Sequence, residues 1–454
     1  MTNDECLTTI NFTLYTLPFQ LFNPFNPFNP FNPSTMNMTR REFLKSAAVL
    51  AALAPFARLR AQDPATPPAE GADAKPRATG PITRRTMAGE SVSLLGFGCM
   101  RLPRGGDGKI DRPAAERLWS RYLEAGGNYF DTAYMYHDGE SEVAVGDFLS
   151  RRPRDSYFLV DKMPVWMART EDGLKRVFDD QLARTKAEYF DFYLLHSLGW
   201  GNWVLAQKIH ALEFLLERKK EGRIRHLGFS FHDAPEAMDP ILDAYDWEFA
   251  MIQLNYQDWT RYRSKEQYEK LTAKGIDVAV MEPLRGGALA RLNDPAKAIL
   301  RQADPDASPA SWAFRWVASL PGVKLINSGM GRDSDLEDNI RTFSPVKELS
   351  DDERGTIAAA LAAFQQSQAV PCTACRYCVP CPAGVAIPEI FALWNAYKAD
   401  GEKGRFLRGY EKLPEDARAS ECVRCMRCTK HCPQKIAIPD ELAKIDAEYL
   451  ALKG

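Results

Sequence analysis

Eight short apolar runs, each followed by a segment of helical length, occupy the middle of this 454-residue chain. Each run has the length and residue types of a buried strand, and the segments between them have the amphipathic period of helices. Eight strand–helix repeats in about 250 residues predict a (β/α)8 TIM barrel of the α/β class. A doubly wound open sheet is the competing fold, but no G-x-G-x-x-G motif follows the first run. The predicted strands are Leu94–Cys99, Asn128–Thr132, Tyr157–Lys162, Phe190–His196, Ile224–Ser230, Phe249–Leu254, Ile276–Met281 and Lys324–Asn327, with helices at Pro113–Ala125, Thr170–Ala187, Trp203–Glu221 and Ser264–Ala273.

Polar side chains stand at the carboxyl ends of three successive predicted strands, the face at which barrel enzymes build their active sites. Asp131 ends the second strand, Lys162 the third and His196 the fourth, while Tyr136 follows in the loop after Asp131. Each of them alone has an ordinary interpretation as a salt-bridge partner, a packing tyrosine or a buried histidine. Four such groups at one end of a barrel instead predict an active site.

These residue types suit the reduction of a carbonyl by hydride, which leaves an alkoxide in need of a proton. Tyr136 would supply that proton, and Lys162 beside it would lower a phenol pKa that is ordinarily about 10. Asp131 would keep Lys162 charged and oriented. His196 would hydrogen-bond the carbonyl oxygen and polarise it.

Eight of the ten cysteines form two tight groups near the C-terminal end. The first group reads C-x-x-C-x-x-C-x-x-C-P and the second C-x-x-C-x-x-C-x-x-x-C-P. This spacing resembles that of bacterial-type ferredoxins, which hold [4Fe–4S] clusters, although the last interval of the first group is one residue shorter than the ferredoxin run. Structural zinc and disulfides are the alternatives, but two extra thiols in each group exceed the need of a tetrahedral zinc site. The resemblance implies two clusters with crossed ligands, namely Cys372, Cys375, Cys378 and Cys432 on one, and Cys422, Cys425, Cys428 and Cys381 on the other.

Longer motifs around the polar strand ends resemble the aldo-keto reductase family over roughly residues 91–339. They are FDTAYMYHDGESE around Tyr136, VDK ending in Lys162, and LLH ending in His196. The resemblance implies that these three residues and Asp131 form a catalytic tetrad, that the cofactor is NAD(P)(H), and that the substrate is a small carbonyl or alcohol. The dinucleotide contacts that it implies are Ser230, Gln253, Glu282, Pro283, Leu284, Gly286, Ser328, Gly329 and Asn339.

Three positions depart from the pattern of that family. Phe231 follows Ser230 where an asparagine is usual, so one contact to the carboxamide is either lost or taken over by His232. Met281 lies where an aromatic ring often stacks on the nicotinamide. Asp335 lies where an arginine commonly meets the 2′-phosphate of NADPH, with Arg332 close by. A carboxylate there would repel a phosphate and accept a ribose hydroxyl, which favours NADH over NADPH.

The N-terminal part carries a targeting pattern. Residues 22–33 are four Phe-Asn-Pro units, whose prolines exclude helix. Arg40 and Arg41, followed by Phe43 and an apolar run too short to span a bilayer, resemble a twin-arginine signal peptide. The resemblance implies that the folded protein is exported to the periplasm, with membrane contact only through the signal segment if it stays uncleaved. A stretch rich in Ala, Pro and Gly follows and predicts a flexible linker.

These patterns divide the chain into five parts, and its balanced charge, 58 Lys and Arg against 60 Asp and Glu, gives no bulk attraction to nucleic acid. The parts are an N-terminal extension with the signal peptide (1–61), a linker (62–81), the aldo-keto reductase-like barrel (82–345), a connecting helix (346–369) and a ferredoxin-type domain (370–454).

Two functions stay open at this point. In the first, the chain is an exported NAD(P)-dependent oxidoreductase whose clusters serve structure or electron relay. In the second, it is an electron-transfer protein that uses the barrel as a scaffold and has a redox protein as its partner. Hydride moves two electrons whereas a cluster passes one, and no dedicated flavin motif is present to join the two steps. The intact tetrad favours the enzyme.

Overall fold

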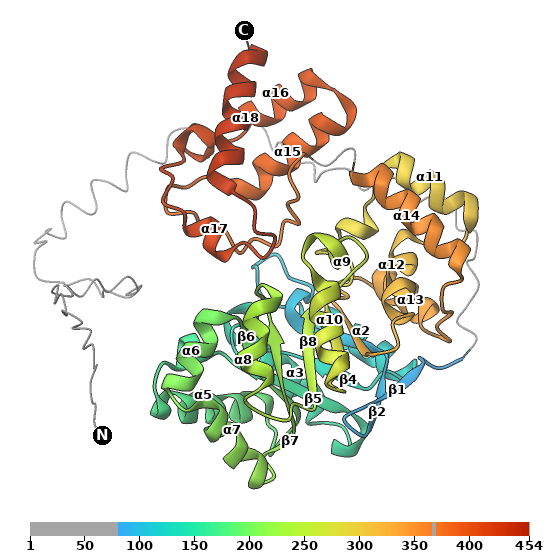
Figure 1. Ribbon diagram of the computed structural model, residues 1–454, viewed down its shortest axis with the longest axis vertical. Helices are drawn as coiled ribbons and strands as arrows, with labels where there is room; N and C mark the ends of the chain where they lie inside the picture. The colour runs from blue at the N-terminus through green and yellow to red at the C-terminus, as the bar shows by residue number, and fades with distance from the viewer. Residues whose placement is uncertain (1–79, 366–368, 454) are drawn as a thin grey trace, which may run out of the picture. The chain divides into compact units, whose positions relative to one another are not determined.

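The computed structural model describes residues 80–365 and 369–453 (Figure 1). The predicted N-terminal extension and twin-arginine signal peptide, together with nearly all of the linker, lie outside the described residues, so export stays a prediction. Within the described residues, no helix is long and apolar enough to cross a membrane.

The central element is a closed barrel of eight parallel strands, which confirms the predicted fold. The strands pair in chain order around the ring, and the last strand pairs with the first. Asp131 pairs with Val160, two residues before Lys162, so neighbouring strands end beside one another. The strands are β3 (Leu95–Gly98), β4 (Tyr129–Asp131), β5 (Phe158–Met163), β6 (Phe190–Leu198), β7 (Ile224–Phe231), β8 (Phe249–Gln253), β9 (Asp277–Met281) and β10 (Val323–Ser328).

A hairpin that the sequence analysis did not predict packs at the amino-terminal end of the barrel. Strands β1 (Arg84–Met87) and β2 (Glu90–Ser93) pair antiparallel through a two-residue turn at Ala88 and Gly89, both with positive φ. Met87 is fully buried and packs with residues that begin the barrel strands, such as Tyr129 and Phe249. The hairpin therefore leaves the carboxyl ends of the strands free for a site.

Helices connect the strands and pack around the barrel (Figure 1). The predicted helix over Ser264–Ala273 has those bounds in the structure, whereas the one predicted over Trp203–Glu221 is two helices. The break falls at His210, whose φ of 52° cannot continue a right-handed helix. The helices are α2 (Arg112–Glu124), α3 (Glu140–Leu149), α4 (Val165–Ala168), α5 (Glu171–Thr185), α6 (Trp200–Lys208), α7 (Ala211–Lys220), α8 (Asp239–Leu242), α9 (Asp258–Arg261), α10 (Ser264–Ala273), α11 (Asp294–Ala303), α12 (Pro309–Ala318), α13 (Asp333–Thr342) and α14 (Asp351–Gln365).

Helix α14 falls in the segment predicted as a connecting helix, and it packs against barrel helices. Its buried residues Ile357, Ala360 and Phe364 share an apolar cluster with Leu300 of α11 and Trp312 of α12. Burial of this apolar face explains why the segment is helical in this place.

Residues 369–453, called the C-terminal module below, have a separate hydrophobic core. This core includes Phe391, Phe406 and Tyr410, and several of the cysteines pack against it. The described residues of the module are helices and loops without a strand, and the cysteine groups lie mostly in the loops. The helices are α15 (Ile387–Asp400), α16 (Lys403–Glu411), α17 (Arg427–His431) and α18 (Ile438–Lys453).

Candidate active site

The four residues predicted as a tetrad line one cavity at the carboxyl ends of the strands. Lys162 Nζ donates to Asp131 Oδ1 at 2.7 Å and to the Thr132 carbonyl at 2.7 Å. Lys162 Nζ also lies 5.0 Å from the centre of the Tyr136 ring. The Tyr136 and His196 rings stand edge to face with their centroids 6.3 Å apart. The structure thus brings together groups separated by up to 65 residues in the sequence.

The ionisation of Tyr136 differs from the prediction that Lys162 lowers its pKa. Burial raises the pKa of Tyr136 well above the ordinary value, and the carboxylates of Asp131, Asp161 and Glu282 raise it further. The predicted lowering is wrong for this pocket, because burial and the surrounding carboxylates outweigh the charge of Lys162. Tyr136 therefore keeps its proton at neutral pH and can act as an acid.

Two histidines of the cavity stay neutral. Burial lowers the pKa of His196 well below its ordinary value, and the nearby Lys162 adds to the effect. Burial, followed by the charge of Lys435, lowers the pKa of His232 to about 4. Neutral imidazoles keep one donor and one acceptor nitrogen each, so both rings can hydrogen-bond an uncharged carbonyl group.

The inner end of the cavity has the features of a nicotinamide site. The whole cavity has a volume of about 110 Å³. Besides the tetrad, its lining includes Ser230, His232, Gln253 and Met281. Gln253 Nε2 donates to Asp258 Oδ2 at 2.8 Å, which leaves the buried Gln253 Oε1 without a partner among the described residues. A carboxamide N–H would satisfy this acceptor, so the residues present fit the ring that the family resemblance implies.

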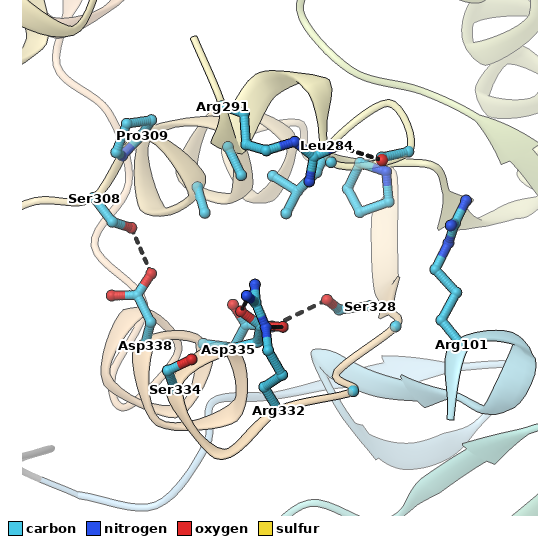
Figure 2. A pocket seen from close by; sticks show the side chains of 18 of the residues that line it. Arg101, Leu284, Arg291, Ser308, Pro309, Ser328, Arg332, Ser334, Asp335 and Asp338 are labelled. Atoms are coloured by element: carbon cyan, nitrogen blue, oxygen red, sulfur yellow. Dashed lines mark hydrogen bonds and ion pairs between the residues drawn. The ribbon is translucent and has the colours of Figure 1, made fainter. Parts of the chain in front are cut away.

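A groove of about 940 Å³ adjoins the cavity, and the remaining predicted dinucleotide contacts line it. In Figure 2, Leu284 and Arg291 lie on one side and Ser328, Arg332 and Asp335 on the other. Asn339 Nδ2 donates to Ser328 Oγ at 3.0 Å and holds it in place. The predicted contacts on this groove are Glu282, Pro283, Leu284, Gly286, Ser328, Gly329 and Asn339.

Two arginines of the groove, Arg332 and Arg341, are already paired with carboxylates. Arg332 donates to both carboxylate oxygens of Asp335, at 2.8 and 3.1 Å, as Figure 2 shows. Arg341 pairs with Asp338, which also accepts from Ser308. A phosphate beside them would have to compete with carboxylates for each of these guanidinium groups.

The cysteines gather in two sets that cross between the two sequence groups. Burial is the main cause that raises the pKa of Cys372 to about 11, and the nearby Cys375 and Cys432 thiols add to the shift. Burial likewise raises the pKa of Cys428, and the nearby Cys422 and Cys381 thiols add to this shift. Cys432 thus lies with the first sequence group and Cys381 with the second, as crossed ligation requires. The ligand assignment itself stays a prediction.

The first set encloses a small cavity. Cys372, Cys375, Cys378 and Cys432 line it together with apolar residues such as Phe391. Within the described residues all cysteines are free of disulfides, and no three Cys, His, Asp or Glu side chains lie close enough to hold a single metal ion. Thiols around a cavity with an apolar shell fit the ligand demand of an iron–sulfur cluster.

Comparison with known families identifies both parts. The model of the aldo/keto reductase family matches residues 94–362, more than half of the chain. The chain belongs to the aldo/keto reductase family. A 4Fe-4S dicluster domain matches residues 371–437. This aldo/keto reductase is therefore an oxidoreductase of an NAD(P)-dependent family that also carries an iron–sulfur domain.

Similar proteins support the same classification. The uncharacterized oxidoreductase YqkF of Bacillus subtilis is 24% identical over 289 residues, 58% of this chain and 90% of that protein. The NADH-specific methylglyoxal reductase of Escherichia coli is 27% identical over 224 residues, 44% of this chain and 66% of that protein. The structure of aldo-keto reductase AKR11C1 from Bacillus halodurans (holo form) matches with a TM-score of 0.52 and 25% identity, over 62% of this chain and 96% of that one.

In this aldo/keto reductase, residues of the C-terminal module also line the catalytic cavity, which the sequence analysis missed. They are Thr373, Cys375, Tyr377, Pro433 and Gln434. Gly286 comes so close to the module that a Cβ there would lie 3.0 Å from the Thr373 carbonyl oxygen. The cysteine spacing predicts which thiols bind iron, but it does not indicate where the residues between these thiols lie.

A buried arginine, also missed, joins the barrel to the module. Arg285 is fully buried, and its Nε donates to Asp258 Oδ1 at 2.9 Å. Its terminal nitrogens donate to the Pro371 carbonyl at 3.3 Å and to Gln434 Oε1. Because Asp258 also accepts from Gln253, one buried charge pair links the nicotinamide end of the site to the segments that carry Cys372 and Cys432.

Proposed function

We propose that this protein reduces small carbonyl compounds with NADH, with Tyr136 as the proton donor. The observation that carries the proposal is the Lys162–Asp131 pair beside the Tyr136 ring in a cavity that opens onto a dinucleotide-sized groove. Methylglyoxal reductases among the relatives support a small substrate.

The proposed chemistry divides the work among the four residues. The nicotinamide, when bound, supplies the hydride equivalent. Tyr136 Oη is protonated at neutral pH, and it gives that proton to the developing alkoxide. Neutral His196 donates a hydrogen bond to the carbonyl oxygen. Lys162, held by Asp131, places a positive charge beside the phenolate that remains.

NADH rather than NADPH is the proposed cofactor, because the carboxylates of Asp335 and Asp338 pair with Arg332 and Arg341 and would oppose a 2′-phosphate there. Ser230 and Gln253 would hold the carboxamide. Ser328, Gly329 and Asn339 on one side, with Glu282, Pro283, Leu284 and Gly286 on the other, would hold the rest of the dinucleotide.

We also propose two [4Fe–4S] clusters with the crossed ligands predicted above. The grouping of Cys432 with the first cysteines and of Cys381 with the second supports this ligand scheme. Anaerobically purified protein should contain about eight iron and eight sulfide per chain. Values near four of each would refute the two-cluster assignment.

Export by the twin-arginine route is part of the proposal, because this route carries folded proteins with their cofactors in place. The support is the Arg40-Arg41 motif before a short apolar run. Replacement of both arginines by lysine should leave the protein in the cytoplasmic fraction. Unchanged export of the double variant would refute the route.

The reductase function is tested by Tyr136→Phe in the holo-protein. NADH oxidation with methylglyoxal should fall by about 10²–10⁴-fold while the dinucleotide dissociation constant changes little. Tyr134→Phe is the matched control, because Tyr134 Oη bonds to Asp180 at 3.1 Å and does not line the cavity. If both variants keep full activity, or the wild type binds no dinucleotide, the proposal fails.

Electron relay is a second candidate function, favoured by a wall that two cavities share. Thr373, Cys375 and Gln434 line both the catalytic cavity and the cavity of the first thiol set. An electron therefore has one layer of residues to cross. Under this function, a one-electron acceptor such as oxidised cytochrome c should reoxidise dithionite-reduced protein without added nucleotide, as followed by electron paramagnetic resonance. Persistence of the reduced signal would leave the clusters with a structural role.

A further inference from the structure

The catalytic cavity has two walls of different origin. The tetrad, His232 and Gln253 come from the barrel, while Tyr377 and Gln434 come from the C-terminal module. The barrel of this protein therefore does not define its substrate space alone. Any substrate that reaches Tyr136 also meets side chains held by the cysteine loops.

Tyr377 is fixed in position by the loop that carries it. It lies between Cys375 and Cys378, and the preceding Arg376 has a φ of 67°, which turns the chain sharply. The Tyr377 hydroxyl contacts Met100 Sδ at 3.8 Å, a weak acceptor. Tyr377 is 46% exposed, and it lines the catalytic cavity together with Tyr136, Glu282 and Cys375.

Gln434 adds a second polar group to the same wall. Its Oε1 accepts from Arg285, so the amide N–H₂ is the part left to face the cavity. Tyr377 Oη and the Gln434 amide are both hydrogen-bond donors. Donors opposite the tetrad suit a ligand oxygen beyond the one that Tyr136 and His196 would bind.

The space limits the size of such a ligand. The cavity measures about 110 Å³, and a nicotinamide ring would have to share it. The ring centre of Trp166 lies 5.2 Å from that of His196, so Trp166 is close to the site. Only a few non-hydrogen atoms of substrate fit beside the ring.

We propose that Tyr377 is a substrate-positioning residue that makes the cavity prefer short carbonyl compounds with a second oxygen on the neighbouring carbon. This inference rests on the proposed reductase function and deepens it. It assigns to the C-terminal module a direct part in substrate selection, in addition to the binding of iron and sulfide.

The test compares hydroxyacetone with acetone, which differ by one hydroxyl group, in the holo-protein and its Tyr377→Phe variant. The wild type should reduce hydroxyacetone with the higher kcat/KM, and the variant should lower the ratio of the two values by about tenfold, mainly through KM. Tyr449→Phe is the control, because Tyr449 belongs to the same module but contacts Glu411 and Lys453 away from the cavity. Iron content and NADH affinity should be unchanged in both variants.

A binding readout separates this inference from the reductase function. Titration of each ketone against Trp166 fluorescence measures affinity without turnover, with Trp166→Phe confirming the origin of the signal. If the wild type turns over neither methylglyoxal nor either ketone, the reductase function fails, and Tyr377 is judged by binding alone. Equal hydroxyacetone affinity in wild type and Tyr377→Phe, or equal losses for both ketones, would overturn the inference.

Discussion

The barrel and the C-terminal module hold their functional groups by different means. In the barrel, each catalytic side chain is fixed by protein contacts, such as the 2.7 Å bonds from Lys162 Nζ to Asp131 and Thr132. In the module, the thiols lie mostly in loops, and those of the first set line a small cavity. The barrel site is therefore preorganised by the fold, whereas the thiol sites depend on what they bind.

This difference explains why the barrel and the C-terminal module need a fixed contact between them. The cysteine loops line part of the catalytic cavity. If their position depended only on a bound cluster, this part of the cavity would be poorly ordered unless other contacts held the loops to the barrel. Arg285 does this from a rigid position, because it is paired with Asp258 and both are fully buried. Substitutions that remove a contact within the barrel site or a contact between barrel and module should therefore differ in their losses of stability, activity and iron.

The largest loss of stability and activity is expected for Lys162→Met, which removes the ammonium group that pairs with Asp131. Asp131 would be left as a buried, unpaired carboxylate, so unfolding free energy should fall by about 3–5 kcal/mol and kcat by at least about 10³-fold. Urea denaturation and steady-state kinetics measure the two effects. Lys175→Met is the control, because its pair with Asp179 is exposed and should contribute at most about 0.5 kcal/mol.

A second substitution at this site sharpens the same point. Asp131→Asn combined with Lys162→Met removes both charges and should recover part of the lost stability without recovering activity. Recovery of activity in the double variant would show that the pair serves folding alone.

Arg285→Met should cause the next largest effect and should act on both parts. Unpaired Asp258 would cost about 3 kcal/mol of stability. The segments at Pro371 and Gln434 would lose their anchor, so the iron bound by the first thiol set should decrease while the second set keeps its iron. Iron analysis and electron paramagnetic resonance measure this selectivity.

Arg315→Met separates the stability effect from the iron effect. Arg315 is also nearly buried and pairs with Glu353, but its contacts are with the barrel helices and the adjoining loop. Its loss should destabilise the protein and leave the iron content unchanged. An unchanged iron content in Arg285→Met as well would refute the role of Arg285 as the fixed contact between barrel and module.

The sequence predicted the parts of the molecule that follow local rules. All eight barrel strands have their predicted places, because buried parallel strands are short apolar runs, and the tetrad follows from their carboxyl ends. The hairpin at Ala88 was missed because only Gly89 signals its turn. Arg285 and Tyr377 were missed because their contacts join segments 86–277 residues apart, which no local period records.

His232 should give a smaller effect that depends on pH. Its pKa in the folded protein is about 4, below the ordinary 6.5, so between these values the unfolded chain binds a proton that the folded protein does not. Stability should therefore fall as the pH drops from about 6.5 towards 4, by on the order of 3 kcal/mol from this group. His232→Asn should flatten this part of the curve, and His210→Asn, at an exposed residue, should not. Equal acid sensitivity in both variants would contradict the assignment.

The smallest predicted effect concerns the choice of dinucleotide. Asp335→Asn would release Arg332 from its two hydrogen bonds and leave it free for a 2′-phosphate. NADPH should then bind about tenfold more tightly, worth about 1.4 kcal/mol, while NADH affinity changes less than about twofold. Fluorescence titration of both nucleotides measures the ratio.

Asp333→Asn is the matched control for this last prediction. It makes the same charge change in the first turn of α13, but Asp333 does not line the groove. If Asp333→Asn raises NADPH affinity as much as Asp335→Asn does, the effect comes from the general field of the helix rather than from the freed guanidinium. A selective gain at Asp335 would mean that one paired arginine sets the cofactor preference of a groove that the barrel otherwise preorganises.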